Sequence, residues 1–114
     1  MTPAEIINGL AAKNRLLTAK NDEYIELAEK KAQAERDYNI EVRTKTLMCR
    51  SDGDPVTVIS TLVKGDQVVA KLKFDLDVAT AVERACLESI KDLRSQIDTY
   101  RSLLSWLKAE LQSQ

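Results

Sequence analysis

Residues 69–111, VAKLKFDLDVATAVERACLESIKDLRSQIDTYRSLLSWLKAEL, decide the fold of this chain. Apolar side chains recur through them at alternating intervals of three and four residues, which is the a and d spacing of a heptad repeat. The ladder consists of Val69, Leu72, Leu76, Ala79, Glu83, Cys86, Ile90, Leu93, Ile97, Tyr100, Leu104, Leu107 and Leu111. A period of about 3.5 residues held this long predicts a helix packed lengthwise against another helix as a coiled coil.

A second long helix is predicted ahead of this ladder. Thr2, Pro3 and Glu5 have the pattern of a capping box, which begins a helix. No strong breaker follows before residues 51–55, SDGDP. Its weaker seam consists of Ile7, Leu10, Asn14, Leu17, Asn21, Tyr24, Ala28, Lys31, Glu35, Tyr38, Val42 and Lys45.

The expected organisation is a single all-α domain over residues 1–114, built as a long antiparallel helical hairpin. Arm one covers about residues 3–47, a structured tip about 48–65, and arm two about 66–111, with Asp66 as its cap. The tip contains the β-branched run PVTVISTLV at residues 55–63. We expect a short helical turn there, capped by Asp54 ahead of Pro55 and folded back on the end of the hairpin. The alternative is a strand that pairs with another chain.

The register of the two arms can also be predicted. If residues of the two arms whose numbers add to 114 face each other, Leu17 lies against Ile97, Ala28 against Cys86, and Lys31 against Glu83. The last pair matches the charged member of one ladder with a charged member of the other, which penalises shifted registers. The alternative is that both side chains lie at the edge of the seam with their charged ends in water.

Arm two has more apolar surface than one seam can bury. The off-seam residues are Val68, Phe74, Val78, Val82, Ala85, Leu87, Leu103 and Trp106. A two-fold homodimer that forms a four-helix bundle would cover them, and the alternative is a different protein partner. Tyr100, Leu103 and Trp106 form the candidate partner surface, although Trp106 also fits a second seam inside a bundle.

The residues that usually carry catalysis are scarce. The chain contains no histidine, and its two cysteines, Cys49 and Cys86, have no zinc-binding spacing. Cys86 is on the seam and fits a small core residue. We therefore expect no enzyme activity, metal or cofactor. No apolar run is long enough to cross a membrane, and the N-terminus has no secretory pattern, which favours a cytoplasmic setting.

Nucleic-acid binding is the alternative function. Arg43, Arg50 and Lys64 lie near the predicted tip and could contact phosphates. The net charge of the chain is −1, and several aspartates belong to the same region, so this alternative is not favoured.

Three segments are similar to known sequences: residues 54–79, DPVTVISTLVKGDQVVAKLKFDLDVA, residues 85–90, ACLESI, and residues 95–107, SQIDTYRSLLSWL. They resemble a group of small coiled-coil phage and prophage proteins of Gram-positive bacteria. The resemblance implies a phage origin and a host-cytoplasm setting, and it transfers no site residues. From the helical hairpin and the lack of catalytic residues, we expect a non-catalytic protein–protein interaction module that acts on or within host or phage replication, recombination or defence machinery.

Overall fold

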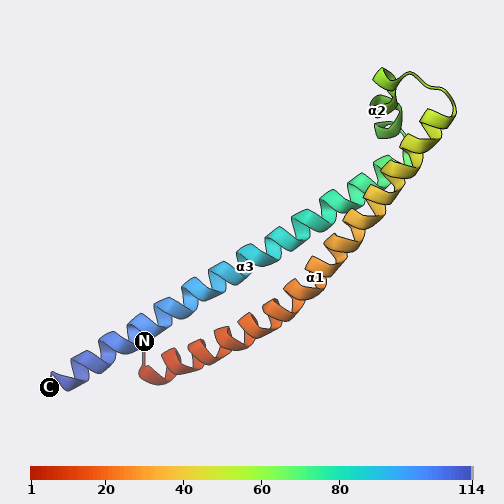
Figure 1. Cartoon of the computed structure of the whole chain (residues 1–114). Coiled ribbons are helices and arrows are strands. Elements are labelled where there is room, and N and C mark those ends of the chain that lie inside the picture. The colour runs from red at the N-terminus through yellow and green to blue at the C-terminus, as the bar shows by residue number, and fades with distance from the viewer. Residues whose placement is uncertain (114) are drawn as a thin grey trace. The chain divides into compact units, whose positions relative to one another are not determined.

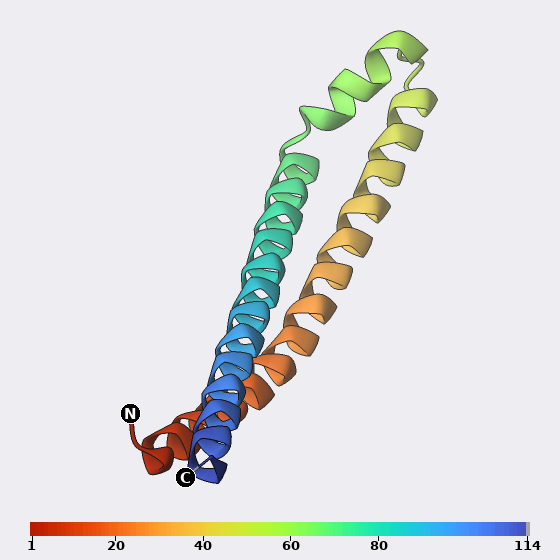
Figure 2. The same ribbon diagram turned by 90° about the vertical axis from the view of Figure 1, so that its left-hand side faces the viewer.

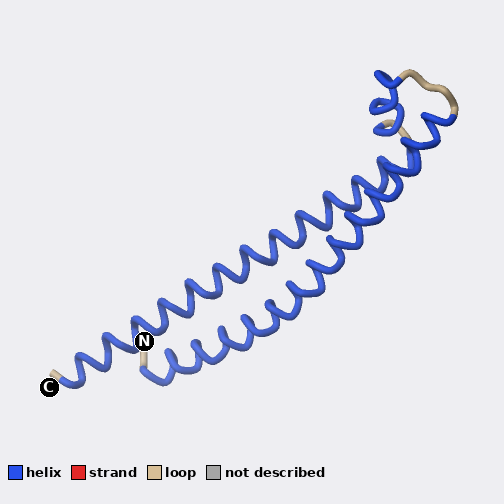
Figure 3. Tube along the Cα trace, in the orientation of Figure 1, coloured by secondary structure: helices blue, strands red, loops and turns tan. Residues whose placement is uncertain are grey.

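The computed structural model of this protein describes residues 1–113. It consists of three helices, α1 (Pro3–Ser51), α2 (Val56–Lys64) and α3 (Gln67–Gln112). The two long helices pack antiparallel and the short helix connects them, so the predicted all-α helical hairpin is confirmed (Figure 1). Within residues 1–113 the remaining backbone is loop or turn (Figure 3).

Side-chain capping begins both long helices as the sequence predicts. The backbone N–H of Glu5 donates to Thr2 Oγ1, and the N–H of Thr2 donates to Glu5 Oε2, both at 3.2 Å. At the start of α3, Asp66 Oδ2 accepts hydrogen bonds from the N–H groups of Val68 and Val69. These bonds satisfy backbone donors that a helix N-terminus leaves without partners.

Helix α1 ends at Ser51, one turn beyond the predicted end. The N–H of Gly53 donates to the carbonyl of Arg50, and the N–H of Asp54 donates to the carbonyl of Cys49. This pair of bonds is a Schellman motif, which needs a residue with positive φ after the helix. Gly53 supplies it with φ of 79°. Gly53 therefore ends α1 and turns the chain toward α2.

The tip forms a helix, as favoured from the sequence. Helix α2 begins after Pro55, and the N–H of Val58 donates to the Pro55 carbonyl. No side chain caps it, so the suggested cap by Asp54 is wrong. Figure 2 shows α2 lying between the end of α1 and the start of α3.

The chain divides into two compact units. Unit 1 comprises residues 1–25 and 84–114, and unit 2 comprises residues 26–83. The buried residues of unit 1 are Ile6, Cys86, Ile90, Leu93 and Ile97. In unit 2 the buried residues are Ile59, Val63 and Val69, with Tyr38, Val42 and Cys49 packed against them. The cores therefore differ: one is a seam between two helices, and the other includes α2.

The ladder of α3 is correct from Val69 to Leu107, because every member is buried or half-buried. Leu111 is exposed. On α1 the predicted seam is wrong at four positions, where the preceding residue faces inward instead. Ile7, Asn14, Asn21 and Glu35 are exposed, whereas Ile6, Lys13, Lys20 and Ala34 are buried or half-buried. At the first of these positions Ile6 is 1% and Ile7 is 55% exposed. Adjacent helical residues point about 100° apart, so only one of the two can face the partner helix.

The alignment of unit 1 also differs from the predicted register. The ring of Tyr100 lies over Gly9, and a Cβ added to that glycine would be 2.7 Å from the ring. The predicted register instead places Asn14 opposite Tyr100. The thiol of Cys86, expected opposite Ala28, donates to the Lys20 carbonyl at 3.6 Å. Both displacements have the same direction and amount to at least one helical turn. Gly9 explains the choice, because a residue without a side chain leaves room for the aromatic ring.

Candidate functional site

The clearest functional feature of unit 2 is an apolar groove on one side of its helix pair, which we call the α3 groove. Its lining residues are Leu27, Lys30, Phe74, Asp75, Val78, Ala79 and Val82. Phe74, Val78 and Val82 follow one another at intervals of four residues, which places them on one face of α3. They are 66%, 45% and 44% exposed. Exposure of three large apolar side chains to water is unfavourable, because full burial of each would contribute about 1.5–3 kcal/mol of stabilising free energy.

Charges flank the α3 groove on both helices. Lys30 extends from α1, and Asp75 extends from α3, where Lys71 Nζ lies 3.1 Å from its Oδ2. Outside the groove lining, Lys73 Nζ lies 3.0 Å from Asp77 Oδ1 on α3. This hydrogen bond, and the charge of Asp77, raise the pKa of Lys73. The groove is therefore an apolar strip with charged edges, the usual composition of an interface core and rim.

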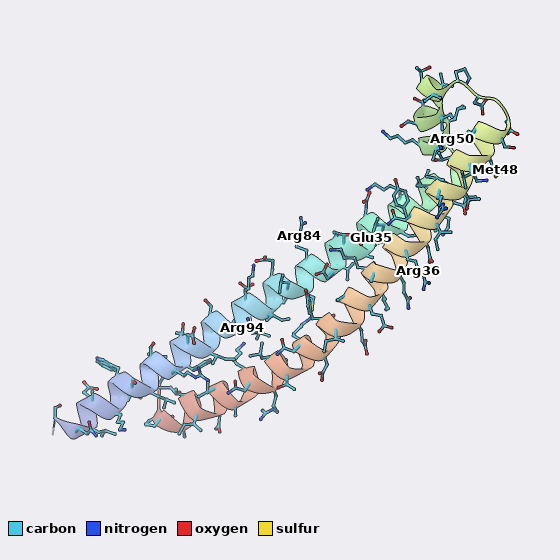
Figure 4. All side chains as sticks on the ribbon, viewed as in Figure 1. Glu35, Arg36, Met48, Arg50, Arg84 and Arg94 are labelled. Carbon is cyan, nitrogen blue, oxygen red and sulfur yellow. The ribbon has the colours of Figure 1, made fainter. Side chains whose placement is uncertain are left out.

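A second feature of unit 2 is a cavity of about 310 Å³ between α1, α2 and the start of α3, which we call the tip cavity. Its residues are Tyr38, Val42, Thr46 and Arg50 of α1, Val56, Ile59, Ser60, Val63 and Lys64 of α2, and Val69 of α3. The apolar floor is formed by the buried Ile59, Val63 and Val69. Arg50, at the end of α1, lies beside α2 (Figure 4).

The structure brings together two of the three predicted tip cations. Arg50 and Lys64 both line the tip cavity, whereas Arg43 does not. Sequence reasoning did not find Thr46 and Ser60 in the same cavity, because their proximity depends on how α2 folds against α1. The only available signal was the expectation that the tip folds back on the hairpin.

The predicted partner surface on α3 of unit 1 separates into an inner and an outer part. Tyr100 is half-buried over Gly9, whereas Leu103 is 37% and Trp106 is 62% exposed. Tyr100 and Leu103 line a shallow pocket with Met1, Lys13, Gln96 and Thr99, and Trp106 does not line it. Trp106 lies outside this pocket, about one helical turn after Leu103 on α3.

Lys31 and Glu83, which the register pairs, lie together in unit 2. Lys31 Nζ is 3.0 Å from Glu83 Oε2, and the side chains are 37% and 14% exposed. Long side chains make this contact compatible with more than one alignment of the helices. The pair therefore constrains the register less tightly than the Tyr100 and Gly9 contact does.

The two thiols have different surroundings. Cys86 is 4% exposed in the seam of unit 1. Cys49 is half-buried near the end of α1, and partial burial, followed by the negative charge of Asp54 and a hydrogen bond with it, raises the pKa of its thiol. A raised pKa keeps the thiol protonated at neutral pH, which is the opposite of an activated nucleophile.

Residues 1–113 contain no group of three or more histidine, cysteine, aspartate or glutamate side chains placed to hold a metal ion. In the same range, none of the helices has the length and apolar character needed to cross a membrane. No protein-family model, curated protein or solved structure matches the chain.

Proposed function

We propose that this protein is a non-catalytic protein–protein interaction module that works as a homodimer, with the α3 groove as the surface where two copies meet. The row of exposed Phe74, Val78 and Val82 carries this proposal. Such a row on one helix face is the usual signature of a helix that packs against a further helix. A second copy would supply that helix and complete a four-helix bundle.

The accessible surface area supports a second copy as the occupant. The chain exposes 8278 Å². A compact monomer of this mass, 12.8 kDa, is expected to expose about 6,300 Å². The surplus is roughly 2,000 Å² for each chain, and obligate dimers bury about 2,000–5,000 Å² in total over both partners. Burial of that surplus in a dimer is therefore consistent with a stable interface.

The charged edges of the α3 groove favour association between like copies. Lys30 on one side carries a positive charge, and Asp75 on the other side carries a negative charge. A two-fold axis presents the same patch from both copies, so Lys30 of each copy can approach Asp75 of the other. A groove with a single sign of charge would repel its own copy.

The absence of catalysis is part of the proposal. It is supported by the protonated state of the Cys49 thiol, by the burial of Cys86, and by a sequence without histidine. The proposed role is within phage or host replication, recombination or defence machinery; the resemblance to phage proteins implies only a phage origin and a host-cytoplasm setting. In that role the dimer would present further surfaces, such as Leu103 and Trp106, to a protein of that machinery.

Light scattering after size-exclusion chromatography tests the dimer. We expect the wild-type protein to have the mass of two chains at micromolar concentration, and Val78→Asp to have the mass of one chain while its helical circular dichroism persists. Ile25→Ser is the matched control, since it removes an exposed apolar side chain of α1 that does not line the α3 groove and should leave the mass unchanged. A wild-type monomer at all concentrations, or a Val78→Asp dimer, would refute the proposed dimer.

The alternative function, an accessory protein that contacts nucleic-acid phosphates, is supported by Arg50 and Lys64 on the same cavity. Phosphate contacts weaken steeply as salt rises, because bound counterions are released from the nucleic acid. Retention of the protein on DNA at low salt, lost at higher salt and in Arg50→Gln/Lys64→Gln, would support this alternative. Absence of retention at low salt would remove it.

A further inference from the structure

The tip cavity combines an apolar floor with positively charged residues in its lining. Its floor is apolar, with Ile59, Val63 and Val69 each no more than 6% exposed. The charged residues of its lining are Arg50 and Lys64, and no carboxylate belongs to the lining. Two cations therefore border an apolar hollow without an anion to balance them.

The cations of the tip cavity also lack partners elsewhere. Among residues 1–113, neither Arg50 nor Lys64 forms an ion pair. The nearby lysine Lys45 differs, since its Nζ lies 3.7 Å from Asp66 Oδ1 and 3.8 Å from Glu41 Oε1. The hydroxyl of Ser60, on the wall of the cavity, makes no hydrogen bond with the described residues. Three polar groups that can donate to an anion thus remain available in one place.

A purely structural role accounts for only part of this arrangement. Arg50 is in the last turn of α1 and Lys64 is in the last turn of α2, where a positive charge complements the helix dipole. That role requires no cavity and no common location. The helix dipoles therefore explain the sign of the two charges but not the apolar floor between them.

We infer that the tip cavity binds a small amphipathic anion, of the class of medium-chain carboxylates. The guanidinium group of Arg50 holds a carboxylate through two parallel hydrogen bonds, and Lys64 adds a second positive charge. The apolar tail of the ligand lies on the floor formed by Ile59, Val63 and Val69, where it removes apolar surface from water. The volume of about 310 Å³ is at the lower end of the range for ligand sites, which matches a small ligand.

Decanoate, used below its micelle concentration, is the probe for this site. We expect saturable binding by isothermal titration calorimetry, with backbone amide shifts in nuclear magnetic resonance spectra concentrated at residues 38–69. Decylamine has the same tail with a positive head, and acetate has the same head without the tail. Neither should saturate the site, because each lacks one of the two features that the cavity recognises.

Variants assign the binding to the tip cavity. Arg50→Gln/Lys64→Gln should weaken decanoate binding at least tenfold, whereas Arg43→Gln, which removes a cation of α1 outside the cavity, should leave it unchanged. Ser60→Trp keeps both cations but fills the cavity, and it should also abolish binding; circular dichroism verifies that each variant folds.

Three results would overturn the inference: decylamine binding as tightly as decanoate, equal binding by the double variant, or equal weakening by Arg43→Gln. Binding that changes only in proportion to dimer content, measured by light scattering in the same samples, would assign the cavity to a second copy and would also overturn it. The dimer test at Val78 is independent of all these results.

Discussion

Units 1 and 2 contain parts of the same two long helices but bury them differently. In unit 1 the α3 ladder is buried at Cys86, Ile90, Leu93 and Ile97. In unit 2 the ladder is buried at Val69, next to α2, and its members from Leu72 to Glu83 are only half-buried. A heptad ladder therefore predicts which face of a helix turns toward its partner, but the depth of burial depends on what else covers that face.

The difference gives the two units different roles. Unit 1 has the deeper seam and holds its helices together through apolar contacts. Unit 2 uses α2 to close one end and leaves the α3 groove open beside the half-buried ladder. Both the proposed dimer surface, with its exposed Phe74, Val78 and Val82, and the tip cavity belong to unit 2.

The largest expected effect is the loss of stability when a ladder residue of α3 is truncated, and it should differ between the two units. Ile90→Ala should lower the free energy of unfolding by about 2–5 kcal/mol, because Ile90 is 3% exposed and its truncation leaves a cavity. Leu76→Ala, at a half-buried position of unit 2, should cost about half as much. Ile25→Ala, at a residue that is 66% exposed, serves as the control and should change stability by no more than about 0.5 kcal/mol. Urea unfolding at one protein concentration measures all three, and equal losses at Ile90 and Leu76 would break the comparison.

A smaller effect is expected at the close approach of Gly9 and Tyr100 in unit 1. An alanine within a helix is normally more stable than a glycine by about 1 kcal/mol. We expect Gly9→Ala instead to lower the stability by about 1 kcal/mol, since the added Cβ would lie 2.7 Å from the ring and displace it. In a Tyr100→Ala background the same substitution should become stabilising. Stabilisation by Gly9→Ala in the wild-type background would show that the ring moves away without cost.

Removal of the helix caps also compares the two units, and the expected loss of stability is similar to that for Gly9→Ala. Asp66→Ala removes an acceptor of two backbone N–H groups at the start of α3, and it should lower the unfolding free energy by about 1 kcal/mol. Thr2→Ala removes a cap whose two hydrogen bonds are exposed to water, whereas the bond from Val69 to Asp66 is partly buried, so Thr2→Ala should cost less. Asp66→Asn preserves a capping oxygen and is the control. If Thr2→Ala cost more than Asp66→Ala in thermal unfolding, this ranking would be wrong.

The Lys31 and Glu83 pair should contribute less than the apolar seam. Desolvation offsets much of the attraction in a half-buried pair, so a double-mutant cycle with Lys31→Gln and Glu83→Gln should give a coupling energy of about 0.5–1 kcal/mol. The coupling should fall as salt rises, because Lys31 is 37% exposed. A coupling above about 2 kcal/mol, or one that salt does not change, would contradict this assignment.

The smallest expected effect is a difference between the rates at which the two cysteine thiols are alkylated. Cys86, buried in unit 1, should react with iodoacetamide only when the protein unfolds. Cys49, in unit 2, should react in the folded protein but slowly at pH 8, because its raised pKa leaves less thiolate than a free cysteine has. The rate should increase as pH rises toward that pKa, and Asp54→Asn should accelerate it by removing a negative charge that raises the pKa. A Cys49 faster than free cysteine at pH 8 would restore it as a reactive nucleophile.

Several features could be predicted from local sequence because their causes are local. The caps at Thr2 and Asp66 each involve residues within one helical turn. The face of α3 that turns inward follows from the spacing of its apolar residues alone. The candidate site was found less completely, since Arg50 and Lys64 were identified as neighbours of the tip, while the groove residues Leu27 and Lys30 lie far from Phe74 in the chain and have no motif that links them.

The sequence by itself determined that two long helices form, where they begin and which face of α3 is apolar, since hydrogen bonding and side-chain periodicity within a helix act over a few residues. Only the tertiary structure decided which residues of α1 those faces meet. A slip of about one turn exchanges neighbouring members of the seam and keeps it buried, so the ladder alone allows more than one alignment. The fit of Tyr100 over Gly9 distinguishes them, and the fold of α2 against α1 creates the tip cavity. Both depend on contacts between residues distant in the chain.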